Sequence, residues 1–198
     1  MNEPDTRRPI ALAILLIVGG ALGLLAAFEL TLDKFQVLEN PNSHLSCNFS
    51  VLVQCGANLS SPEGSAFGFP NPLIGLICFP APIIVGVAAL AGARFPRWFW
   101  SLFNLGLLGA LAFVVWLMSV SIFLLGTLCP WCMLVWSVVI PMFFATTLYN
   151  LGRGNLPANG GIRRAGAALY GWTPLISLLA YVAVAVVAQL RLNVLAQI

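Results

Sequence analysis

The residues of this sequence best suited to chemistry are its five cysteines. Cys129 and Cys132 form a Cys-Pro-Trp-Cys motif, and Cys47 and Cys55 form a second, more widely spaced pair. A cysteine thiolate attacks disulfides, so two neighbouring pairs can relay electrons by thiol–disulfide exchange through a mixed disulfide. The pattern therefore predicts a redox relay, provided that the fold brings the two pairs together.

The Cys129-Pro130-Trp131-Cys132 motif opens an apolar run, and a proline in this position suits the first turn of a helix. Residues three apart share a helix face, and the free amides at a helix N-terminus stabilise a thiolate. We therefore expect Cys129 and Cys132 to alternate between a dithiol and a disulfide. A structural disulfide and half of a zinc site are the alternatives for so short a motif.

Cys47 and Cys55 lie in a polar segment, where a purely structural disulfide is the alternative to a redox role. Their spacing is unlike the second knuckle of a four-cysteine zinc site, so we expect no metal. Two pairs in one chain favour a relay, and a relay needs a final electron acceptor. Because His44 is the only histidine and the sequence shows no haem, flavin or iron–sulfur motif, a lipid-soluble quinone is the most economical acceptor.

The composition places these cysteines in a membrane protein. Of the 198 residues, 60% are hydrophobic and 8% are charged, and the mean hydropathy is +0.97. A soluble domain is about a quarter charged, so this chain could not cover its own surface with polar groups. The stretches without Asp, Glu, Lys or Arg are residues 9–28, 64–93, 98–152 and 165–190.

A membrane-spanning helix needs about 20 apolar residues, so the long third stretch holds two helices and each of the others holds one. Helices are expected because the two-residue alternation of a membrane barrel is missing. The sequence predicts an all-α bundle of five transmembrane helices near residues 10–30, 72–92, 98–125, 131–149 and 174–190.

The loops between five spans alternate sides, and the basic residues sort with them. One side holds Arg7, Arg8, Arg94, Arg97, Arg153, Arg163 and Arg164, and the other holds Lys34 and Arg191. The positive-inside rule makes the first side cytoplasmic. We therefore expect a multi-pass protein of the cell membrane, with a cytoplasmic N-terminus and both cysteine pairs on the outer face, where disulfides persist.

Two other interpretations of these charges are less favoured. A cleaved signal would need a core of about 7–15 apolar residues, and the run at 10–30 is longer. The net charge of +3 is explained by topology, so we expect no nucleic-acid partner. Cys78 falls inside the second span, where an isolated apolar thiol is unreactive, so we expect a small buried hydrophobic residue outside the redox mechanism.

Over residues 11–149 the chain resembles the vitamin K epoxide reductase family in its bacterial form. The order of the two pairs is specific, because the loop pair comes first here and last in the analogous DsbB family. The resemblance rests on the outer cysteine pair, the C-x-x-C that opens the fourth span, and the segment Phe67-Gly68-Phe69-Pro70-Asn71-Pro72 with Gly75.

The resemblance implies a membrane thiol–disulfide oxidoreductase that generates disulfides outside the cytoplasm. Its four-helix redox core would occupy residues 1–150, with an outer cysteine loop at 31–71, and a cytoplasmic connector and fifth helix would occupy 151–198. Many bacterial members continue into a thioredoxin-like domain, whereas this chain ends at Ile198. We therefore expect a separate thioredoxin-like, DsbA-like extracytoplasmic partner.

The family pattern also implies a role for each matching residue. Cys47 and Cys55 would take electrons from the partner, Cys55 would exchange with Cys129, and Cys132 would face the quinone. The quinone would be menaquinone or ubiquinone, with menaquinone preferred. The expected quinone contacts are Ser61, Asn71, Trp136, Phe67 and Phe69.

Alternatives to this scheme remain open at this point. Asn71 precedes Pro72 and is equally suited to capping a helix, and Trp136 stands where vertebrate members have a tyrosine. An endoplasmic-reticulum vitamin K epoxide or quinone reductase would use the same thiols. A non-enzymatic zinc-binding membrane scaffold would bind metal instead of passing electrons.

Overall fold

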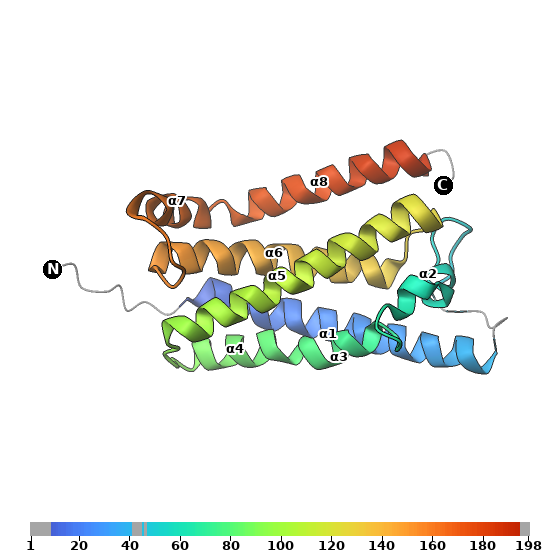
Figure 1. Cartoon of the computed structure of the whole chain (residues 1–198), viewed down its shortest axis with the longest axis horizontal. Helices are drawn as coiled ribbons and strands as arrows, with labels where there is room; N and C mark the ends of the chain where they lie inside the picture. The colour runs from blue at the N-terminus through green and yellow to red at the C-terminus, as the bar shows by residue number, and fades with distance from the viewer. Residues whose placement is uncertain (1–8, 41–44, 46, 195–198) are drawn as a thin grey trace.

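The computed structural model describes residues 9–40, 45 and 47–194. Over these residues the chain is a bundle of long helices that run side by side (Figure 1). Five helical stretches are long and apolar enough to cross a membrane, and many of their apolar side chains are exposed on the outside of the bundle. The chain is thus a multi-pass, all-α membrane protein, as predicted.

The elements follow one another in a simple order. In the chain they are α1 (Ile10–Glu39), α2 (Gly56–Ser60), the short 3-10 helix η1 (Pro62–Ser65), α3 (Pro72–Cys78), α4 (Pro80–Leu90), α5 (Arg97–Ser119), the π-helical turn η2 (Val120–Leu125), α6 (Pro130–Arg153), α7 (Gly160–Tyr170) and α8 (Thr173–Leu192).

The first helix continues beyond its predicted end. Hydropathy predicts a span that ends near residue 30, whereas α1 runs to Glu39. Its last turns include Asp33 and Lys34, which lower the hydropathy without breaking the helix. The predicted outer loop at 31–71 therefore begins with helix and also contains α2 and η1. This extension brings a side of α1 alongside the cysteine segment.

A proline divides the second span. Pro80 lacks an amide N–H, so it begins α4 rather than continuing α3. Cys78 was expected to be buried, and this expectation is wrong, because its side chain is exposed. The reason is that α3 packs mainly against α1, so the opposite side of α3 opens onto a cavity described below.

The connector after the fourth span contains a helix that hydropathy does not reveal. In α7, Arg163 and Arg164 make the segment too polar to register as a span. Asn159 caps it, since its side-chain oxygen accepts a hydrogen bond from the Ile162 amide at 3.2 Å. The helix packs against α6 at Gly166, where a Cβ would lie 2.6 Å from Leu151 Cβ.

The bundle is held together by close helix contacts around α1. Gly86 of α4 has no room for a side chain, because a Cβ there would lie 2.7 Å from the Ala13 carbonyl oxygen. Leu12 and Leu16 of α1 are fully buried in the same apolar cluster as Val139 and Met142 of α6. α1 is therefore the central scaffold on which both α4 and α6 rest.

The two ends of the bundle differ in what they carry. The connections from α4 to α5 and from α6 to α7 lie at one end, on the left in Figure 1. The segment with α2 and the junction between α5 and α6 lie together at the opposite end. Because these last two segments carry Cys55 and Cys129, the fold places both cysteine pairs at the same end.

Candidate functional site

Backbone pairing joins the two cysteine segments. Val53 and Leu128 form a parallel bridge. The Leu128 amide donates to the Leu52 carbonyl at 2.8 Å, and the Gln54 amide donates to the Leu128 carbonyl at 3.1 Å. Cys55 and Cys129 each follow directly after this pairing, so the bridge fixes where both residues lie.

Side-chain hydrogen bonds secure the same junction from the side of α2. Asn58 donates to Thr127 Oγ1 at 3.2 Å, and its Oδ1 accepts from Ser121 Oγ at 3.0 Å. Ser121 and Thr127 are buried, where a polar group without a partner costs about 1–3 kcal/mol. These bonds therefore favour a single placement of α2 against the junction between α5 and α6.

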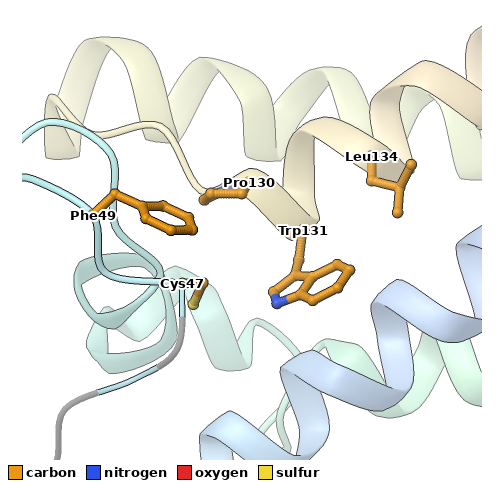
Figure 2. Close-up of a pocket in the computed structure, with 5 residues that line it drawn as sticks. All are labelled: Cys47, Phe49, Pro130, Trp131 and Leu134. Carbon is orange, nitrogen blue, oxygen red and sulfur yellow. The ribbon is translucent and has the colours of Figure 1, made fainter. Parts of the chain in front are cut away.

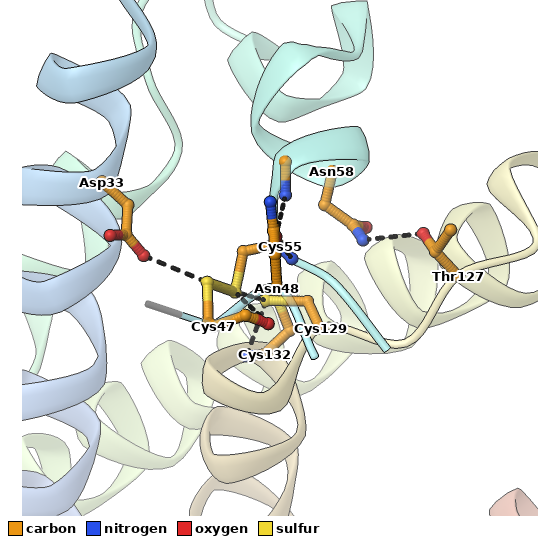
Figure 3. Close-up of a disulfide and its surroundings, with 9 residues drawn as sticks. Asp33, Cys47, Asn48, Cys55, Asn58, Thr127, Cys129 and Cys132 are labelled. Carbon is orange, nitrogen blue, oxygen red and sulfur yellow. Dashed lines mark hydrogen bonds between the residues drawn. A yellow bond between two sulfur atoms is a disulfide. The ribbon is translucent and has the colours of Figure 1, made fainter. Parts of the chain in front are cut away.

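The sulfur atoms of the two pairs meet at this junction. Cys47 and Cys55 form a disulfide, while Cys129 and Cys132 are free thiols. Cys129 Sγ lies 3.3 Å from Cys55 Sγ, and both side chains are 0% exposed. Figure 3 shows the sulfurs of Cys47, Cys55 and Cys129 in sequence. The geometry allows Cys129 and Cys55 to exchange directly.

Asn48 fixes the turn that presents Cys55. Its Oδ1 accepts hydrogen bonds from the amides of Cys55 at 3.0 Å and Gly56 at 3.3 Å. These amides stand at the start of α2, where helix amides have no partner within the helix. Asn48 thus restrains the backbone of Cys55 beside Cys129.

Cys129 occupies the N-cap position of α6. Its Sγ accepts a hydrogen bond from the Cys132 amide at 3.4 Å. The Cys132 side chain is the main cause that lowers the pKa of the Cys129 thiol, and the amides of Cys132 and Trp131 act in the same direction. Burial and the charge of Asp33 oppose this effect but do not cancel it. The predicted helix-start motif thus has the expected effect on its first thiol.

Cys132 faces a large cavity on the side of the bundle. The cavity has a volume of about 1100 Å³ and extends between α3, α4, α5 and α6. Its lining is mainly apolar, which suits a ligand that arrives from the lipid phase. All the residues that sequence reasoning assigned to a quinone site line it: Ser61, Phe67, Phe69, Asn71 and Trp136.

These lining residues play different local parts. Phe67 stacks on Phe69 and lies against Phe113, whereas Trp136 is buried in the bundle. Asn71 stands at the N-cap of α3 without capping it. Its amide instead donates to the Glu63 carbonyl at 2.7 Å, and its Oδ1 accepts from the Ala66 amide. Asn71 therefore holds the η1 segment at the mouth of the cavity, and its amide nitrogen carries a second N–H.

The structure also reveals polar residues that the motifs did not single out. Glu63 lines the cavity, and its buried Oε2 has no hydrogen-bond partner among the described residues. Asp33, on the extension of α1, places Oδ2 at 3.2 Å from Cys47 Sγ. Asn48 and Asn58 are further examples. A single acidic or amide side chain carries no spacing signal, so only the folded chain identifies these residues.

A smaller pocket lies beside the loop disulfide. It has a volume of about 250 Å³ and is lined by Cys47, Phe49, Pro130, Trp131 and Leu134. Figure 2 shows the loop residues on one side of it and the first turns of α6 on the other. A molecule that reaches Cys47 through this pocket would therefore pass between apolar side chains.

One group of potential metal ligands coincides with the redox site. The ligand atoms of Asp33, Cys47 and Cys55 lie within 4.8 Å of one another. Two of the three are the sulfurs of the disulfide, which offers no thiolate to a metal while the disulfide is intact.

In the part of the chain that the structure describes, five apolar spans and two cysteine pairs, with the sulfurs of Cys55 and Cys129 in contact, define a membrane redox protein. Comparison with known families gives its lineage, because the model of the vitamin K epoxide reductase family matches residues 14–147. The chain belongs to the vitamin K epoxide reductase family and is a membrane redox enzyme, as its sequence predicts. No curated protein and no solved structure matches it.

The lowered pKa of Cys129 gives a testable pH dependence. Replacing Cys132 with alanine removes the strongest cause of the lowering. A hydrogen bond to a charged group stabilises that charge, so the pKa of Cys129 should rise in the variant. The thiolate would then form only at higher pH.

The measurement is an ultraviolet titration of the thiolate in reduced protein that lacks Cys47, Cys55 and Cys78, with and without Cys132→Ala. The variant's first midpoint should lie at higher pH than that of its parent. Equal midpoints would show that Cys132 does not stabilise the Cys129 thiolate.

Proposed function

We propose that this protein is a quinone-dependent thiol–disulfide oxidoreductase that generates disulfides for a separate, thioredoxin-like partner. The observation that carries the proposal is the 3.3 Å separation of Cys55 Sγ and Cys129 Sγ, together with the position of Cys132 on the large cavity. The contact between the sulfurs supports exchange between the two pairs. The position of Cys132 supports electron transfer from this thiol to an acceptor bound in the cavity.

The electron path follows from thiol–disulfide exchange. A thiolate of the partner attacks Cys47, and the partner's second thiolate resolves the mixed disulfide, which leaves Cys47 and Cys55 reduced and the partner oxidised. Cys55 then attacks Cys129 in the oxidised core pair and releases Cys132. Attack of Cys47 on Cys55 releases Cys129. The loop disulfide is restored, and two electrons now reside on Cys129 and Cys132.

The cavity next to Cys132 fits a quinone. Its apolar walls suit a ring and an isoprenoid chain, while Glu63 Oε2 is a buried acceptor that no described residue engages and that suits the hydroxyl of the quinol product. Asn71 and Ser61 add polar groups at the mouth. A bound quinone would supply the two-electron acceptor for closure of the Cys129–Cys132 disulfide. Menaquinone is the preferred candidate over ubiquinone, because it shares its naphthoquinone ring with vitamin K.

The partner would approach Cys47 through the small pocket at the same end. Phe49 and Val51 are 74% and 87% exposed there, and exposed apolar side chains favour protein–protein contact. The distribution of arginines supports an extracytoplasmic location for this end and a cytoplasmic N-terminus. A DsbA-like protein outside the cell membrane would meet the disulfide in that orientation.

The proposed chemistry uses only part of the chain. We assign residues 1–150, with the outer segment 31–71, to the redox core, because the four cysteines and the cavity lining all precede residue 150. Residues 151–198 would add a cytoplasmic connector and a fifth helix. In support, α8 packs mainly against α6, to which Tyr181 donates a hydrogen bond at the Ser137 carbonyl.

Removing the second core thiol tests the electron path. In Cys132→Ser protein, quinone reduction driven by a reduced thioredoxin-like partner should fall to background, because the core disulfide cannot form. The Cys47–Cys55 disulfide should still oxidise one equivalent of the reduced partner, which would show that the variant folds. Turnover at the wild-type rate would contradict the proposal, whereas turnover of an epoxide by the unmodified protein would favour the epoxide reductase alternative.

Filling the cavity tests the quinone site separately. Gly106 lines the cavity, and a Cβ there meets no atom within 4 Å, so Gly106→Phe should fit without disturbing the helix. We expect the KM for a menaquinone analogue to rise at least about tenfold, equivalent to about 1.4 kcal/mol, with thiol exchange unchanged.

The matched control is Gly171→Phe, since Gly171 also has open space but lies outside the cavity. Its KM should equal that of the wild type. An unchanged KM in Gly106→Phe would place the quinone elsewhere.

A further inference from the structure

The carboxylate of Asp33 lies against a sulfur that must gain and lose a proton. Its Oδ2 is 3.2 Å from Cys47 Sγ, and the residue is 4% exposed. Figure 3 shows the side chain pointing from α1 toward the disulfide. A disulfide sulfur carries no proton, so the contact becomes a hydrogen bond only when Cys47 is reduced to a thiol.

Among the described residues, no basic side chain pairs with the Asp33 carboxylate. Lys34, its neighbour in sequence, donates to the Leu59 carbonyl, and no ion pair to Asp33 occurs among the described residues. The ionisable groups whose charges act on it are Glu29, one turn earlier on α1, and Cys129 at the start of α6. Of Glu29 and Asp33, only Asp33 contacts a sulfur atom among the described residues.

The relay requires a base at this position. After Cys55 has attacked the core pair, Cys55 and Cys129 share a mixed disulfide and Cys47 is a thiol. Cys47 must lose its proton to attack Cys55 Sγ, because the thiolate is the nucleophile. The Asp33 carboxylate lies 3.2 Å from Cys47 Sγ, so it is already in place to accept that proton.

We propose that Asp33 is a catalytic base of the relay, and accepts the Cys47 thiol proton as Cys47 closes the loop disulfide. In this step the Cys47–Cys55 bond forms, the Cys55–Cys129 bond breaks, and Cys129 leaves as a thiolate. The proton moves from Cys47 Sγ to Asp33 Oδ2, and no external oxidant is consumed. The assignment rests on the relay of the proposed function and adds a proton path to it.

The test follows the mixed disulfide rather than turnover. Fully oxidised protein is mixed with dithiothreitol, quenched in acid at successive times, alkylated and digested, and the Cys55–Cys129 linkage is quantified by mass spectrometry. Neither quinone nor partner protein is present. In Asp33→Asn, which keeps the shape of the side chain, decay of this linkage should slow about 100-fold, the lower end of what a positioned base contributes.

The pH profile separates a base from a structural role. Without the carboxylate, the rate should rise about tenfold per pH unit below the thiol pKa, because hydroxide must form the thiolate, so the deficit should shrink as the pH rises. The lost charge cannot itself cause the slowing, because it would lower the pKa of Cys129 and make it a better leaving group.

Two further variants complete the experiment. Asp33→Glu should recover part of the rate, since it restores a carboxylate. Glu29→Gln removes the neighbouring acid that does not contact a sulfur and should decay as the wild type does. Wild-type decay in Asp33→Asn, or slowing by the same factor at every pH, would overturn the role of Asp33. A wild-type protein in which no Cys55–Cys129 linkage forms would overturn the relay itself.

Discussion

Two backbone hydrogen bonds, between residues 52–54 and Leu128, hold the loop that carries Cys55 against the start of α6. Without them, the place of Cys55 beside α6 would depend on the hydrogen bonds of Asn58 and on side-chain packing alone. With them, its sulfur stands 3.3 Å from that of Cys129. Thiol exchange needs contact between sulfurs, so this pairing is the physical condition for passing electrons from one pair to the other.

The remaining architecture supports that contact. α1 reaches beyond its apolar span and presents Asp33 to the loop disulfide, while the hydrogen bonds of Asn58 keep α2 seated on the α5–α6 junction. On the inner side of the same junction, Cys132 borders the apolar cavity. The start of α6 thus places Cys129 against the loop disulfide and Cys132 at the apolar cavity, so the two thiols of one helix turn have different neighbours.

The sequence was sufficient for the fold class and the family because both depend on strong patterns. Long charge-free stretches define spans, and the position of Pro130 defines the start of α6. Expectations failed where tertiary contacts outweigh hydropathy. The helical extension of α1 carries charges that hydropathy interprets as loop, and α7 is amphipathic and short. Cys78 is exposed because α3 has a neighbour on one side mainly.

The site could be anticipated in its cysteines and only partly in its surroundings. Spacing and order identified the two pairs, and the predicted lining residues do gather at one cavity. The roles of Asp33, Asn48 and Glu63 depend on which atoms they approach in the folded chain, and their identities alone carry no such information. Asn71 was predicted only as a quinone contact or a helix cap. In the structure it lines the cavity, and its amide also holds η1 in place.

The central claim is that Cys55, and not Cys47, exchanges with Cys129. The most direct measurement compares two double variants by non-reducing mass spectrometry. Of the four paired cysteines, Cys47→Ser with Cys132→Ser leaves Cys55 and Cys129, which should form an intramolecular disulfide nearly completely on mild oxidation. Cys55→Ser with Cys132→Ser leaves Cys47 and Cys129 and should remain largely reduced. Equal disulfide formation in the two proteins, or a preference for Cys47, would contradict this account.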